Sequence, residues 1–221
     1  MAEARTILYV HGMGGGGDSR IPSVLREHLS VEYARTGRPP VAFAVICRTY
    51  SFDPEVAAGQ LSRWASEVQP DLVIGESMGA VHAVALRGYP HLFVSPSLNA
   101  PLFFRVMAWL CRLPGMTRFF DRHYHPKEGD RQPLHFTPEL LRKWPAVRAD
   151  ALANSTRNGS HDLFFAFFGT RDRYRRSGVV SIRTWRRWFG PGTWTLYPGS
   201  HFMEEEFILS LLIPKIFSVL A

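Results

Sequence analysis

The most informative segment of the sequence reads Asp71-Leu-Val-Ile-Gly75-Glu-Ser77-Met-Gly79. Residues 71–75 form an apolar run typical of a buried strand, and residues 80–86 favour a helix. The G-x-S-x-G pattern between them suits a tight strand-to-helix turn, which holds the serine hydroxyl clear at the carboxyl edge of a parallel sheet. Glycines are needed two positions before and after the serine because such a turn brings the backbone close to neighbouring elements. The segment therefore predicts a nucleophilic Ser77.

Short apolar runs alternate with helix-like segments on both sides of this turn, as in a parallel sheet flanked by helices. The runs predict strands over residues 7–10, 41–47, 71–75, 91–94, 162–168 and 194–197. Helices are predicted over residues 22–34, 80–86, 102–112, 177–189 and 204–220, and two more begin at Asp53-Pro54 and Thr137-Pro138. The predicted fold class is α/β, with a mostly parallel central sheet.

Residues 98–160 interrupt this alternation and are rich in Phe, Trp, Pro and Arg. The segment is too short and too often broken by proline to promise a core of its own. We expect a helical lid, inserted into an α/β core that residues 1–97 and 161–221 form. Because the segment leaves the core after one strand and returns before the next, it should lie over the sheet edge that carries Ser77.

Composition places the chain among ordinary globular proteins. With 221 residues, 46% of them hydrophobic, it can form one domain with a substantial core. The net charge is +7, and only three of the 26 basic residues are lysines. Such a charge can attract nucleic acid, anionic lipid or an anionic substrate. No nucleic-acid-binding signature accompanies it, so we expect no nucleic-acid partner. The sequence leaves the oligomeric state open.

The two cysteines, Cys47 and Cys111, lie far apart in apolar stretches, which is typical of reduced, buried thiols in a cytoplasmic protein. No Cys/His cluster has the spacing of a metal site. The N-terminal residues show no signal-peptide pattern, and the apolar segment 207–220 is short for a bilayer span and contains Pro214. We therefore expect a cytoplasmic protein without a metal and without stable membrane insertion.

A nucleophilic serine needs a general base, and the base needs an acid that orients it. Among the histidines after Ser77, His201 follows the last predicted strand in Pro198-Gly-Ser-His201, at the expected sheet edge. Asp172 directly follows the strand before it, which matches the chain order serine, acid, histidine. Asp162 is the rival acid, but it precedes the same strand and should lie at the opposite edge. Ser77, Asp172 and His201 are therefore the predicted catalytic residues.

The tetrahedral intermediate of acyl transfer also needs backbone N–H donors for its oxyanion. The residue after the nucleophile, Met78, should supply one of them. The other should come from the loop after the first strand, with Met13 as first choice and Gly14 as second. Because this loop is rich in glycine, its backbone can approach the substrate closely, which makes His11 and Gly12 candidate substrate contacts. The glycine run is equally compatible with a merely permissive loop.

These motifs together resemble the α/β-hydrolase superfamily. The likeness spans nearly the whole chain outside the insertion, and the compact size is similar to that of the small single-domain serine esterases of the bacterial YqiA/YcfP type. It rests on Leu8-Tyr-Val-His-Gly12, Gly75-Glu-Ser-Met-Gly79, Asn99-Ala-Pro101, Gly169-Thr-Arg-Asp172 and Gly199-Ser-His201. The resemblance implies hydrolysis of a carboxylic ester or acyl thioester through an acyl-enzyme, with Ser77, Asp172 and His201 as the triad and with no cofactor.

The predicted lid supplies further candidate substrate contacts. Its aromatic residues Phe103, Phe104 and Trp109 are expected to line an apolar acyl pocket. Arg171 belongs to a dense group of arginines around Asp172, which would favour a substrate that bears carboxylate or phosphate. A solvated helix face explains the same arginines, and both interpretations stay open at this point.

Two interpretations of other classes remain. The loop Gly12-Met-Gly-Gly-Gly-Gly17 satisfies G-x-G-x-x-G between a strand and a helix, and Arg48 could contact a 2′-phosphate, which would indicate an NADP-dependent oxidoreductase. This interpretation leaves Ser77, Asp172 and His201 unexplained. The other is a non-catalytic hydrolase-fold protein that only binds a small molecule, and such a protein would not need all three residues.

Overall fold

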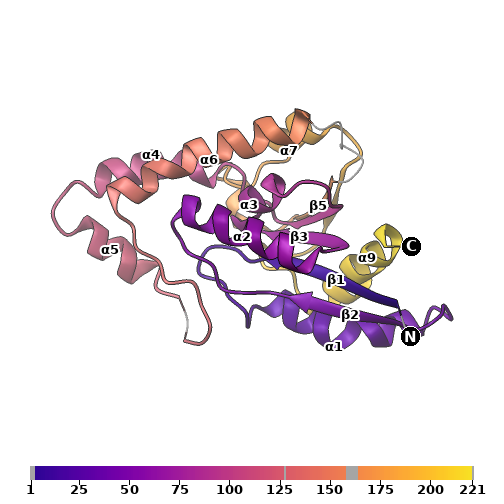
Figure 1. Ribbon diagram of the computed structural model, residues 1–221. Helices are drawn as coiled ribbons and strands as arrows, with labels where there is room; N and C mark the ends of the chain where they lie inside the picture. Colours follow the sequence, from indigo (N-terminus) through magenta and orange to yellow (C-terminus); the bar gives the residue numbers. More distant parts are fainter. Residues whose placement is uncertain (1–2, 127, 158–163, 221) are drawn as a thin grey trace.

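The predicted apolar runs form one parallel sheet in the computed structural model, which describes residues 3–126, 128–157 and 164–220 (Figure 1). The strand order is β2-β1-β3-β4-β5-β6, and every neighbouring pair is parallel. The predicted α/β fold class is thereby confirmed. The strands are β1 (Glu3–Val10), β2 (Val41–Ile46), β3 (Leu72–Glu76), β4 (His91–Val94), β5 (Phe164–Gly169) and β6 (Trp194–Tyr197).

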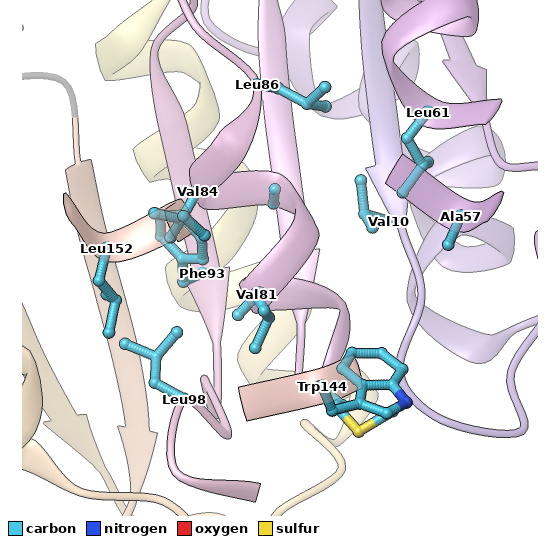
Figure 2. Packing of buried hydrophobic residues seen from close by; sticks show 14 of the residues in the cluster. Val10, Ala57, Leu61, Val81, Val84, Leu86, Phe93, Leu98, Trp144 and Leu152 are labelled. Carbon is cyan, nitrogen blue, oxygen red and sulfur yellow. The ribbon is translucent and has the colours of Figure 1, made fainter. Parts of the chain in front are cut away.

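Alternate residues of each strand point into two separate cores. Leu8 and Val10 of β1 belong to the core on one face of the sheet, and Ile7 and Tyr9 belong to the core on the other. Both sets are buried because helices cover both faces, so the central strands are apolar without alternation. Figure 2 shows part of the first core, which includes Val10 of β1, Val81 of α3 and Trp144 of α6.

The helices begin where local sequence favours it. Asp53 accepts a hydrogen bond from the Glu55 amide at 3.0 Å and caps α2, with Pro54 in the first turn. The helix predicted over 177–189 begins only at Ile182, where Ser181 caps it. The described helices are α1 (Arg20–Ala34), α2 (Pro54–Val68), α3 (Gly79–Ala85), α4 (Ala100–Leu110), α5 (Met116–His123), α6 (Pro138–Arg157), η2 (Arg173–Arg175), α7 (Ile182–Phe189), α8 (Glu205–Phe207), η3 (Ile208–Leu212) and α9 (Ile213–Val219).

The last predicted helix is divided into three pieces. A π-helical turn, η3, separates α8 from α9. Pro214 has no N–H to donate to the carbonyl four residues earlier, so a regular α-helical ladder cannot continue through this point. Among the described residues, no helix is both long enough and apolar enough to cross a membrane.

The described residues of the segment 98–160 share the first core instead of forming a separate one. Phe136, Leu141 and Trp144 are fully buried in it, and the Trp144 ring lies 5.7 Å from that of Phe52. In Figure 1, α6 runs along the top of the molecule, whereas α5 lies at the far left, away from the sheet. Part of the predicted lid is therefore core, and α4 and α5 form the part that projects.

Candidate active site

Ser77 occupies a strained turn between β3 and α3. Its backbone has φ = 49°, in the left-handed region that non-glycine residues seldom adopt. The turn also explains both glycines of the motif. A Cβ on Gly75 would lie 2.8 Å from that of Ala83, and one on Gly79 would lie 2.2 Å from the His11 carbonyl oxygen. The G-x-S-x-G pattern is thus required by packing, and it leaves the Ser77 side chain only partly buried.

The loops after β5 and β6 bring two further side chains to Ser77. His201 Nε2 lies 2.8 Å from Ser77 Oγ, and His201 Nδ1 lies 2.8 Å from Asp172 Oδ2. With the proton of neutral His201 on Nδ1, that nitrogen donates to Asp172, and Nε2 accepts from the Ser77 hydroxyl. The three residues named from the sequence therefore form one continuous hydrogen-bonded array.

Asp172 is held in place from both sides. Its Oδ1 accepts from the Tyr174 amide at 2.8 Å, so only Oδ2 faces His201. Asp172 and His201 are 3% and 5% exposed, which keeps water from competing for this bond. The rival Asp162 lies outside the described residues, so the structure does not compare the two acids.

The predicted oxyanion donors lie at the start of α3 and in the loop after β1. Met78 precedes α3, and Met13 and Met78 both line the cavity next to Ser77. Among the described residues, neither backbone amide donates a hydrogen bond to another protein group. Gly14, the second choice, differs because its amide donates to Gln132 Oε1 at 3.2 Å. The geometry therefore favours Met13 over Gly14 as the partner of Met78.

Sequence reasoning missed Gln132, which anchors this loop. The side chain is 1% exposed, and its Nε2 donates to the carbonyl oxygens of Tyr50 and Ser51 at 3.1 and 3.0 Å. Its Oε1 accepts from Gly14, so one amide group from the insertion joins the two loops after β1 and β2. No motif marks such a residue. Ser97 was also missed, and its Oγ lies 3.2 Å from Ser77 Oγ.

Replacing Gln132 by leucine is expected to lower kcat about tenfold or more while changing KM less. Leucine removes the acceptor for the Gly14 amide and the donor to two buried carbonyl groups, so the Met13 amide would lose its fixed position. Steady-state kinetics with a soluble ester would measure the change, with Gln69→Leu on the exposed end of α2 as control. An unchanged kcat in a folded Gln132→Leu protein would contradict this role.

Buried histidines support the same loops without entering the site. The His11 ring stacks on Tyr50 with 4.1 Å between ring centroids, and the Tyr50 hydroxyl donates to the His11 carbonyl oxygen. Burial lowers the pKa of His11 to about 4, and burial also lowers that of His82 to about 4. Both rings are thus neutral at pH 7. Glu76, before the nucleophile, accepts from the Tyr9 hydroxyl at 2.7 Å, and its burial raises the pKa of this carboxyl group.

A cavity of about 1040 Å³ opens beside Ser77, and most of its lining is apolar. Gly12, Phe103 and Phe104, three of the candidate substrate contacts, line it. Three other predicted substrate contacts do not line this cavity. His11 is fully buried under the loop, Trp109 is 62% exposed on the outer side of α4, and Arg171 points toward Glu204. Arg173 lines the cavity instead.

The glycine-rich loop is not arranged to receive a pyrophosphate. Its last four amides already have protein acceptors: Gly14 donates to Gln132 Oε1, Gly15 to the Gly12 carbonyl oxygen, Gly16 to Ser19 Oγ and Gly17 to Asp130 Oδ2. A carboxylate at this position would repel phosphate. Arg48, the candidate 2′-phosphate partner, pairs with Glu67 at 3.0 Å. These contacts count against the dinucleotide interpretation.

Comparison with known proteins finds similarity in fold but not in sequence. No protein-family model matches the chain, and no curated protein matches its sequence. Several solved structures are nevertheless similar over almost the whole chain at low sequence identity. The likeness therefore concerns the fold and not close kinship.

Three of these structures illustrate the likeness. A thioesterase domain from the curacin biosynthetic pathway matches with TM-score 0.54 and 13% identity, over 99% of this chain and 92% of that one. An extracellular alpha/beta-hydrolase from a Paenibacillus species matches with TM-score 0.53 and 11% identity, over 95% and 98%. The fluorophosphonate-binding serine hydrolase FphF of Staphylococcus aureus matches with TM-score 0.52 and 12% identity, over 100% and 85%. The parallel sheet, the turn at Ser77 and these matches together identify the architecture of the chain as the α/β-hydrolase fold.

Proposed function

We propose that the protein is a serine hydrolase that cleaves a carboxylic ester or acyl thioester through an acyl-enzyme intermediate. The observation that carries this proposal is the hydrogen-bonded array of Ser77, His201 and Asp172, which opens onto a cavity with a largely apolar lining. A non-catalytic binding protein would have no use for this array. The proposed activity is that of the small esterases of the YqiA/YcfP type. We also propose a cytoplasmic location, which the two unpaired, buried cysteines favour.

Each group in the site has a defined chemical role in the proposed reaction. His201 Nε2 takes the proton from Ser77 Oγ as this oxygen attacks the acyl carbon, and Asp172 stabilises the imidazolium that forms. The amides of Met13 and Met78 donate to the oxyanion. His201 then returns the proton to the leaving alcohol or thiol. In the second half, His201 takes a proton from water, the hydroxide attacks the acyl-enzyme, and Ser77 leaves with that proton.

A fluorophosphonate probe tests this proposal directly. We expect the wild-type protein to be labelled on Ser77, and we expect turnover of either chromogenic esters or acyl thioesters in a panel of graded chain length. Binding of NADPH without labelling would support the oxidoreductase interpretation. Absence of both labelling and turnover in a folded protein would support the non-catalytic interpretation.

The insertion is proposed to act as a lid that shapes the acyl pocket, and Phe103 is the residue to test. Each buried methylene contributes about 0.8 kcal/mol, so kcat/KM should rise about fourfold per added methylene until the pocket is full. Phe103→Ala should flatten this rise, with less effect on the shortest esters, because Phe103 lines the cavity. Trp109→Ala on the same helix is the control, since its side chain projects outward. Equal effects of the two variants on soluble esters would contradict the role of Phe103.

A further inference from the structure

The outer side of helix α4 is apolar, and Phe119 of α5 and Tyr124 just after it are also exposed. Seven of the eleven exposed large apolar side chains in the described residues lie between 102 and 124, and we call this surface the α4–α5 face. Trp109 and Val106 are the most exposed of them, at 62% and 60%. The face consists of Leu102, Phe103, Val106, Trp109, Leu113, Phe119 and Tyr124.

Helical spacing shows that this exposure is a continuous stripe. Leu102, Val106 and Trp109 recur at intervals of four and three, so they lie on one side of α4, and Leu113 continues the stripe beyond its end. The opposite side of the same helix, with Phe104 and Ala108, is buried in the first core. A helix that is apolar all round needs a second apolar environment, because contiguous exposed patches of this kind mark interaction surfaces.

Positive charge surrounds the stripe. Between residues 101 and 126 the described side chains include four exposed arginines, and among the described residues no ion pair includes any of them. Asp121 is the single acid in that stretch, and it is engaged by His135 Nδ1 at 2.6 Å and by the Phe136 amide at 2.8 Å. The four arginines are Arg105, Arg112, Arg118 and Arg122.

The α4–α5 face is continuous with the opening of the cavity. Phe103, Val106 and Tyr124 belong to the face and also line the cavity. Phe202, next to His201, lines it too and is 55% exposed. In Figure 1, α4 and α5 lie together at one end of the molecule, and both termini lie at the other end. Both termini therefore lie away from the α4–α5 face.

We propose that the α4–α5 face binds peripherally to the surface of an anionic lipid bilayer. Trp109 and its apolar neighbours would enter the headgroup region, and the four arginines would contact lipid phosphates, as in helices that lie in the plane of a membrane. A second copy of the chain is a poorer occupant, because a two-fold symmetric contact would bring the same arginines of both copies together. Docking in this way presents the cavity to amphiphilic substrates in the membrane.

Vesicle sedimentation of the full chain carrying Ser77→Ala tests the proposal, because this variant cannot turn over lipid. We expect binding to phosphatidylcholine vesicles that contain phosphatidylglycerol to be at least about tenfold tighter than binding to phosphatidylcholine alone, and to weaken with salt. Equal binding to both vesicles, or no binding to either, would overturn the proposal. Neither result bears on hydrolysis of soluble esters, so failure here is distinct from failure of the proposed activity.

Paired variants locate the binding surface. Arg112→Gln with Arg118→Gln should weaken binding about tenfold or more, whereas Arg183→Gln with Arg187→Gln on α7 removes the same charge and should not. Trp109→Ala with Leu113→Ala should weaken binding by a similar factor, whereas Val56→Ala with Leu196→Ala, which truncates exposed apolar residues elsewhere, should not. Equal losses in test and control pairs would overturn the assignment. A dimer in light scattering that Trp109→Ala dissociates, without vesicle binding, would assign the face to a second copy and overturn the proposal.

Discussion

Replacing Ser77 by alanine is expected to lower kcat for a soluble ester by about 10⁴- to 10⁶-fold, because the acyl-enzyme can no longer form. Residual activity would come from the oxyanion donors and from substrate binding. Ser97→Ala is the matched control, since its hydroxyl lies 3.2 Å from Ser77 Oγ and receives no proton in the proposed mechanism. It should lower kcat about tenfold at most. Near wild-type turnover of Ser77→Ala would refute the proposed nucleophile.

The same residue links activity to stability. Because Ser77 has φ = 49°, alanine keeps the backbone strain of the turn, whereas glycine removes it. Ser77→Gly should therefore abolish turnover and raise the free energy of unfolding by roughly 1 kcal/mol relative to Ser77→Ala. Denaturant unfolding of the two variants measures this difference. A Ser77→Gly protein no more stable than Ser77→Ala would contradict strain at this turn.

Replacing Asp172 by asparagine is expected to lower kcat about 10⁴-fold with little loss of structure. The asparagine oxygen should keep the place of Oδ1, because it accepts from the Tyr174 amide, and its NH₂ group would then face His201. This group donates to Nδ1, so the imidazole proton moves to Nε2, which can no longer accept from Ser77.

The rival acid provides the control for this variant. Asp162→Asn should change kcat far less than Asp172→Asn, because only Asp172 hydrogen-bonds His201 among the described residues. Measurement of kcat for the three proteins separates the two acids. An effect of Asp162→Asn equal to or larger than that of Asp172→Asn would assign the orienting role to another residue.

The bounds of the strands and the turn at Ser77 follow from local sequence. Residues 91–94 and 194–197 form β4 and β6 with the bounds expected from their apolar runs, because Pro90, Ser95, Thr193 and Pro198 punctuate them. Parallel strands end at one edge, so residues that follow β3, β5 and β6 meet there irrespective of their distance along the chain. This rule places Ser77, Asp172 and His201 at one edge of the sheet, where the structure shows them within hydrogen-bonding distance.

Tertiary packing decided which side chains of the insertion and of the short turns line the cavity. Phe103 lines the cavity and Trp109 does not, because Phe104 and Ala108 bind the other side of α4 to the core and thereby set its rotation. Arg173, and not Arg171, lines the cavity, since Glu204 lies 4.0 Å from Arg171. Gln132 reaches Gly14 from 118 residues away, and no local pattern encodes such a contact. The sequence by itself determined the sheet and the array around Ser77 through periodicity and chain order, whereas contacts between distant segments decided which side chains surround the substrate.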